Sequence, residues 1–84
     1  MKVYFISDIL NEAKILIPEQ VMTIVPRLDD HVDIIQYLKE DDKQVFKSYV
    51  EQNNKLELGR VTGRTWSKAE SEDIVFINLL FIDV

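Results

Sequence analysis

The chain has 84 residues, of which 46% are hydrophobic and 30% are charged, and its fifteen acidic and ten basic side chains give a net charge of −5. A chain of this length forms one hydrophobic core, and the absence of cysteine excludes disulfides, thiolate metal sites and cysteine nucleophiles. No apolar run approaches the roughly 20 residues of a membrane span. We therefore expect one small domain over residues 1–84, in a reducing, cytoplasmic compartment.

The first third of the chain alternates short apolar segments with turn residues. Residues 3–6 are rich in aromatic and β-branched side chains and predict a buried strand. Residues 9–17 fit either a helical stripe or a turn followed by a short strand that ends before Pro18. We favour the turn and the strand. A further short apolar element is expected over 21–25, closed by Pro26.

The middle of the chain carries the clearest helical pattern. Asp29 and Asp30 precede a stripe of apolar residues, and carboxylates suit the positive end of a helix dipole. The stripe lapses over a short charged run and then resumes, and Asp41 begins a pattern that resembles a capping box. We predict two helices, about 30–39 and 42–53, with a single bent helix as the alternative.

A strand interrupted by two glycines follows the predicted helices. Asn53 and Asn54 end the second helix, because asparagine tolerates the left-handed conformation of a helix cap. The alternation of polar and apolar residues over 55–58 then predicts a half-buried strand. Gly59 and Gly63 interrupt the next stretch, and each predicts a β-bulge or a close approach of two backbones.

The chain ends in its most apolar segment. Residues 67–73 are mostly polar and lack proline and glycine, so we expect a seven-residue hairpin loop. Residues 74–82 are apolar on both faces, as is typical of a central strand or of a strand that pairs across a subunit interface. Strands around a helical middle define an α+β domain. We expect a mainly antiparallel four- or five-stranded sheet, with one or two helices packed on one face.

The charges are unevenly distributed along the chain. Residues 55–68 carry four basic side chains and one acidic one, whereas the flanking segments 1–54 and 69–84 are both acidic. If 60–68 is extended, alternate side chains share one face. That face, here called the basic strand, comprises Arg60, Thr62, Arg64, Trp66 and Lys68.

The basic strand fits two functional interpretations. Arginines that bind phosphate and an indole that stacks on bases suit single-stranded nucleic acid. The alternative is an exposed or partner-facing surface whose arginines pair with nearby acids, namely Glu70, Glu72 and Asp73. Trp66 has polar neighbours, which leave an interface role and a core role open. The net charge of −5 opposes phosphate partners.

Acidic residues around the predicted helices form a second candidate surface. This acidic set comprises Asp29, Asp30, Asp33, Glu40, Asp41 and Asp42. Rows of carboxylates can occupy the basic groove of a partner, as in a nucleic-acid mimic. Ordinary capping and solubility explain the same positions. His31 lies among these acids, but adjacent residues at a helix start rarely converge on a metal, so no metal site is expected.

No motif favours an enzyme. The segment 59–63 lacks the Lys-Ser/Thr of a phosphate loop, and no serine lies in a G-x-S-x-G elbow. We expect a non-enzymatic protein-binding module without a cofactor, acting as an inhibitor or adaptor through the acidic set or the basic strand. The alternatives are a nucleic-acid binder that uses the basic strand, and a homo-oligomeric subunit, such as a homodimer, in which 74–82 completes a sheet between chains.

Overall fold

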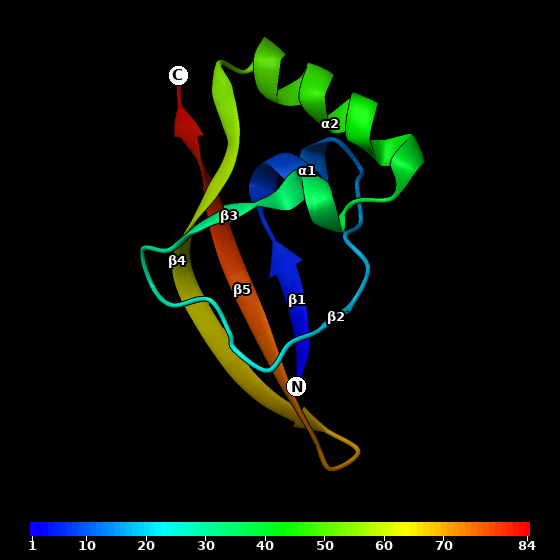
Figure 1. Cartoon of the computed structure of the whole chain (residues 1–84), viewed down its shortest axis with the longest axis vertical. Helices are drawn as coiled ribbons and strands as arrows, with labels where there is room; N and C mark the ends of the chain where they lie inside the picture. Colours follow the sequence, from blue (N-terminus) through cyan, green and yellow to red (C-terminus); the bar gives the residue numbers. More distant parts are fainter.

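A five-stranded mixed sheet forms the framework of the protein in the computed structural model, which describes residues 1–84 (Figure 1). Its strands are β1 (Lys2–Ile6), β2 (Gln20–Val21), β3 (His31–Asp33), β4 (Lys55–Ala69) and β5 (Glu72–Asp83). They lie in the order β2-β1-β5-β4-β3, and only β1 and β5 pair in parallel. The α+β class is therefore confirmed, with one parallel pair in the sheet.

Two α-helices and a short 3-10 helix complete the fold. They are α1 (Asp8–Glu12), η1 (Ile34–Tyr37) and α2 (Glu40–Gln52). Both α-helices lie at the same end of the sheet (Figure 1), where the Tyr49 hydroxyl of α2 donates a hydrogen bond of 3.0 Å to the Glu12 carboxylate of α1. Neither α-helix combines the length and the apolar character that crossing a bilayer requires.

The segment 9–17 contains helix rather than the strand that we favoured. The Ser7 hydroxyl caps α1 by accepting a hydrogen bond of 3.0 Å from the Leu10 N–H. Lys14 then takes a positive φ of 58°, a left-handed conformation that turns the chain away from the helix. The apolar element expected over 21–25 is also shorter than predicted, because only β2 is extended and paired there.

A strand and a 3-10 helix replace the helix predicted over 30–39. Val32 and Ile34 are buried while His31 and Asp33 are exposed, an alternation of period two rather than 3.6. Pairing of β3 with β4 sets this alternation, because Val32 lies directly opposite Gly59. The local helical pattern is thus overridden by a long-range strand pairing, and the single bent helix is excluded as well.

The second predicted helix is confirmed as α2. It begins at Glu40, two residues earlier than predicted from 42, and its N-cap residue Lys39 makes no side-chain cap hydrogen bond. The capping box beginning at Asp41 is therefore wrong. The C-terminal prediction is confirmed, because Asn53 caps the helix and Asn54 has a φ of 56°.

The last two strands form a long hairpin closed by two residues, not by a seven-residue loop. Ala69 lies opposite Glu72, so only Glu70 and Ser71 make the turn. Both turn residues have positive φ, of 52° and 70°. Residues 67–73 are polar because this end of the hairpin extends into solvent beyond the rest of the sheet (Figure 1), so polarity here does not mark a loop.

The predictions for the two glycines and for the terminal strand are confirmed. The register between β4 and β5 shifts between Lys55 and Gly59 and again between Val61 and Gly63. β5 is the central strand, with β1 on one side and β4 on the other. Its backbone pairs with β4 along most of its length and with β1 over residues 74–78.

The core is a single cluster of fifteen buried apolar side chains. Phe46 of α2 is fully buried and meets Phe81 of β5 with ring centroids 5.3 Å apart. The Phe5 ring stacks on Tyr37 at 5.3 Å, which fastens η1 to β1. These aromatic contacts hold α2 and η1 against the sheet and leave the far end of the hairpin uncovered.

Candidate protein-binding surface

The bulge at Gly63 divides the basic strand between two faces of the sheet. Side chains directly opposite each other in an antiparallel pair share a face. Arg60 lies opposite Leu80, whereas Arg64 lies opposite Ile77, whose side chain faces the core. Leu80 and Ile77 are an odd number of residues apart and point to opposite faces. The prediction that Arg60 and Arg64 share a face is therefore wrong, because one extra residue inverts the alternation.

Arg60 and Thr62 are engaged within the protein. The Arg60 guanidinium forms an ion pair of 2.9 Å with the Asp29 carboxylate. The Thr62 hydroxyl donates a long hydrogen bond of 3.4 Å to the Asn78 carbonyl. Neither residue joins the rest of the basic strand as part of a common surface.

The other three residues of the basic strand form one row on the hairpin. We call Arg64, Trp66 and Lys68 the cation–indole row. The Trp66 side chain is 53% exposed, and the Arg64 guanidinium lies 5.7 Å from the centre of its ring. A guanidinium at this distance is attracted to the face of the indole. The row therefore presents a stacked cation and an aromatic surface to solvent.

The acids near the hairpin turn do not neutralise this row in the way that the sequence suggested. Glu72 pairs instead with Lys2 of β1 at 2.6 Å. Asp73 lies 3.9 Å from Lys68, at the limit of an ion pair. Arg64 has no carboxylate partner, and its only side-chain hydrogen bond is a contact of 3.5 Å with the Pro26 carbonyl. The Arg64 guanidinium, which has no carboxylate partner, thus lies beside the exposed indole of Trp66.

The row also lies on a free edge of the sheet. β3 pairs with β4 only as far as Arg60, and the loop before β3 bonds to Val61. Beyond that point no strand lies beside β4, and its lower half runs alone on its outer side (Figure 1). No backbone hydrogen bond outside the strands reaches residues 62–69. We call residues 64–69 the hairpin edge.

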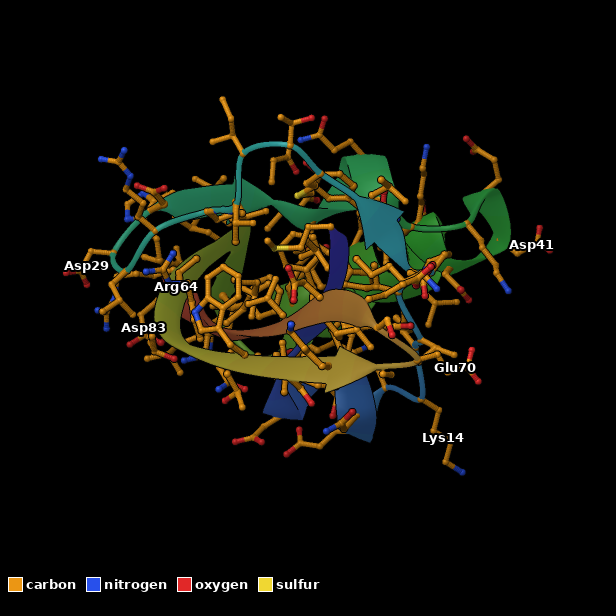
Figure 2. The ribbon with its side chains drawn as sticks, turned by 90° about the horizontal axis from the view of Figure 1, so that it is seen from below. Lys14, Asp29, Asp41, Arg64, Glu70 and Asp83 are labelled. Atoms are coloured by element: carbon orange, nitrogen blue, oxygen red, sulfur yellow. The ribbon has the colours of Figure 1, made fainter.

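The acidic set does not form one surface. Figure 2 shows Asp29 and Asp41 projecting from opposite sides of the molecule. Asp29 belongs to the loop before β3, whereas Asp41 belongs to the first turn of α2. The sequence grouped them as one surface around two predicted helices, but β3 and η1 take the place of the first of those helices.

Most members of the acidic set have local partners. The Asp30 carboxylate accepts a hydrogen bond of 2.8 Å from the Arg27 N–H, and Asp33 caps η1 by accepting one of 3.3 Å from the Ile35 N–H. Glu40 pairs with Lys43 at 2.8 Å, and this hydrogen bond holds the pKa of Glu40 below its usual range. Of these three contacts only that of Asp33 caps a helix, whereas the others are a loop hydrogen bond and an ion pair within α2.

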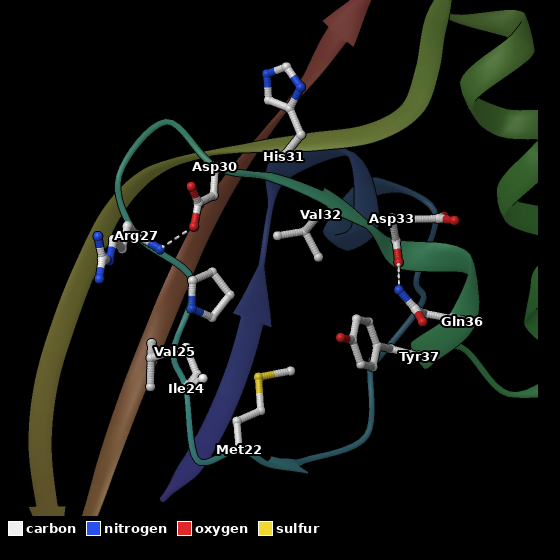
Figure 3. Close-up of a pocket in the computed structure, with 11 residues that line it drawn as sticks. Met22, Ile24, Val25, Arg27, Asp30, His31, Val32, Asp33, Gln36 and Tyr37 are labelled. Carbon is white, nitrogen blue, oxygen red and sulfur yellow. Dashed lines mark hydrogen bonds between the residues drawn. The ribbon is translucent and has the colours of Figure 1, made fainter.

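A hollow of about 560 Å³ lies between the loop before β3 and η1 (Figure 3). Met22, Val32 and Tyr37 point into it, while His31 points away (Figure 3). Sequence reasoning did not find this hollow, because its walls come from segments that meet only in the folded chain. No group of three potential metal-ligating side chains converges in the structure. Its lining also includes charged side chains, and two of them, Asp30 and Asp33, accept hydrogen bonds from backbone N–H groups nearby.

No family model, curated protein or solved structure matches this chain.

Proposed function

We propose that the protein is a non-enzymatic protein-binding module, an inhibitor or an adaptor, that contacts its partner through the cation–indole row. The observation that supports this proposal is the half-exposed Trp66 with the unpaired Arg64 guanidinium stacked beside it. Tryptophan and arginine are the residues most enriched at the centres of protein interfaces. The two occur here as neighbours on one face.

The geometry of the row suits binding of another protein. A fully buried tryptophan side chain covers roughly 150–250 Å² with few rotatable bonds, and about half of Trp66 is still exposed for a partner to cover. Stacking on the indole restrains Arg64, so less conformational entropy is lost when a partner carboxylate or carbonyl accepts its hydrogen bonds. The row is therefore partly organised before binding.

A protein partner is favoured over nucleic acid. The row holds two cations, Arg64 and Lys68, because Arg60 faces the other side of the sheet. Two cations release few counterions from a phosphate backbone, and a net charge of −5 opposes its approach. The proposal also includes a cytoplasmic location, on the ground that the chain contains no cysteine.

Affinity purification with matched variants tests the proposal. Tagged wild-type protein, Trp66→Ala and Leu80→Ala are used as baits in extracts of the cells that express the protein, and captured proteins are quantified by mass spectrometry. Leu80 is the matched control, because its side chain is 55% exposed but faces the opposite side of the sheet. We expect at least one partner that wild type and Leu80→Ala retain and Trp66→Ala loses.

Two further baits separate the competing interpretations. The double variant Asp41→Lys/Asp42→Lys reverses the charge at the start of α2 and should keep the same partner. Nuclease treatment of the extract should leave the capture unchanged. A partner that survives Trp66→Ala but is lost from the charge-reversed bait would overturn the proposal in favour of the acidic residues. Loss on nuclease treatment would favour nucleic acid.

A further inference from the structure

We propose that the hairpin edge binds an extended acidic segment of the partner by strand addition. This inference rests on the proposed function, since it names the chemistry of the partner at the same surface. Two observations support it, one from the backbone and one from the side chains. The backbone supplies free hydrogen-bonding groups along the edge, and the side chains select charge.

The register of the hairpin determines which backbone groups of β4 face the free edge. Ala69 and Glu72 flank a two-residue turn and form its closing hydrogen-bonded pair. Hydrogen-bonded and non-hydrogen-bonded pairs alternate along antiparallel strands. Residues 64, 66 and 68 therefore direct their N–H and C=O groups away from β5, toward the free edge.

The pairing of Val61 supports the same alternation on the other side of the bulge. Its N–H donates to the Asp30 carbonyl at 2.9 Å, and its carbonyl accepts from the Asp29 N–H at 2.8 Å. Both bonds cross the outer edge of β4. One extra residue at the bulge then brings the next outward position to Arg64, as the turn also requires. The edge thus carries three unused donor and acceptor pairs in regular order.

The side chains along the free edge favour an acidic partner segment. Residues with outward backbone groups at 64, 66 and 68 also share one side-chain face. A strand added at this edge places side chains about 4.5–5.5 Å from each of them on that face. A partner strand that complements Arg64, Trp66 and Lys68 would carry an acidic, an apolar and an acidic residue at alternate positions. The partner segment is therefore extended and acidic.

A second copy of this chain suits the edge less well. Antiparallel pairing centred on Trp66 would place Arg64 directly opposite Lys68 of the second copy. Pairing centred on Thr65 avoids that contact but still gathers four cations along one short edge. Like charges on neighbouring strands are destabilising, and natural proteins place lysine on edge strands to prevent self-pairing. Repulsion between cations therefore disfavours pairing of the edge with a second copy, whereas an acidic strand is attracted to it.

Peptide titration tests the inference with a defined probe. The probe is the blocked peptide Thr-Glu-Thr-Val-Thr-Glu-Thr, and its matched control replaces both glutamates with lysine. Trp66 is the chain's single tryptophan, so its fluorescence reports binding at the row directly. Two-dimensional NMR follows each amide of the hairpin edge. We expect the glutamate peptide to bind about tenfold more tightly than the lysine peptide.

NMR distinguishes strand addition from side-chain contact alone. The amides of residues 64, 66 and 68 should shift and gain protection from exchange, whereas those of 65 and 67, which face β5, should change little. Equal binding of the two peptides, or shifts without this alternation, overturns the inference.

A matched pair of variants isolates the backbone contribution. Lys68→Pro and Lys68→Ala both remove the charge, but only proline removes an outward N–H, and neither takes a hydrogen bond from β5. We expect Lys68→Pro to bind the glutamate peptide about threefold to tenfold more weakly than Lys68→Ala. Unchanged dispersion of the core NMR signals shows that both variants fold. Equal affinity of the two variants contradicts strand addition.

The same two variants keep the inference and the proposed function distinguishable. If the cellular partner depends on Trp66 but binds Lys68→Pro as well as Lys68→Ala, the proposed function stands and strand addition fails. If capture is independent of Trp66, the proposed function itself fails. Sedimentation of the purified protein supplies the third outcome: a dimer that the glutamate peptide cannot displace assigns the edge to a second copy and overturns the acidic-segment inference.

Discussion

Gly59 of β4 lies so close to Leu79 of β5 that a Cβ atom at position 59 would be 3.1 Å from the Leu79 Cβ. Leu79 is buried, so it has little room to move. We expect Gly59→Ala to lower the free energy of unfolding by about 1–3 kcal/mol through overpacking. Urea denaturation followed by circular dichroism measures this loss.

The second glycine supplies the matched control. A Cβ atom at Gly63 would meet the amide end of the Asn78 side chain at 3.2 Å, and that flexible group can turn aside. Its φ is not positive, so alanine introduces no backbone strain. Gly63→Ala should therefore change stability by less than about 1 kcal/mol. An equal loss for both variants would show that close approach to Leu79 is not the cause.

Phe46 is the side chain through which α2 contacts the core. It is fully buried and packs against Phe81. Phe46→Ala should cost about 3–5 kcal/mol, a large part of the roughly 4–12 kcal/mol expected for a chain of this length. Phe46→Leu should lose less, because it leaves a smaller cavity. Val45→Ala on the exposed face of the same helix should be nearly neutral in the same urea titration.

The hairpin turn offers a route to higher stability. Glu70 and Ser71 both hold positive φ, which costs a non-glycine residue on the order of 1 kcal/mol. The double substitution Glu70→Asn/Ser71→Gly supplies the Asn-Gly pair that this turn favours. We expect a gain of about 1 kcal/mol and a melting temperature higher by roughly 4–8 °C. An unchanged melting temperature would contradict the assigned turn geometry.

Alkaline pH should weaken the contacts at the N-terminal end of β1. A hydrogen bond to Glu72 raises the pKa of Lys2, and a hydrogen bond to Glu19 raises the pKa of Tyr4. Both groups keep their proton to higher pH in the folded chain than in the unfolded chain. Their contribution is therefore fully present below about pH 10 and is lost as the pH rises through the raised values. Both groups are exposed, so the effect is modest.

Urea titrations at pH 8 and pH 11 check the sign of this effect. The variant Glu19→Gln/Glu72→Gln removes both carboxylates that face Lys2 and Tyr4. The difference in stability between wild type and variant should be larger at pH 8 than at pH 11. A difference that grows with pH would contradict the assigned direction of the pKa shifts.

Local sequence patterns correctly predicted several features that short-range spacing or residue type indicates. The buried strand over 3–6, the helix over 42–53 and the glycine bulges all follow from residue spacing or residue type. The segment 30–39 failed because its apolar residues also satisfy a period of two. Pairing of Val32 with Gly59 decided between the two periods, and that pairing joins residues far apart in the sequence.

The sequence predicted only part of the candidate surface, because strand alternation is local whereas the alignment of β4 with β5 is not. Alternation along an extended strand placed Arg64, Trp66 and Lys68 together, and the structure keeps them on one face. The same rule placed Arg60 beside them, and one extra residue in the bulge moved it to the other face. The sequence indicated a bulge at Gly63 but not its effect on the alternation, because that depends on how β5 aligns with β4.

The sequence by itself determined the α+β class, the approximate place of α2 and the uneven distribution of charge, since each follows from composition or from short-range periodicity. Only the tertiary structure decided which charges meet, which strand is central and which edge stays open. Those features depend on hydrogen bonds between distant strands. The cation–indole row is therefore a property of the sequence, whereas its place on a free edge beside an unpaired backbone is a property of the fold.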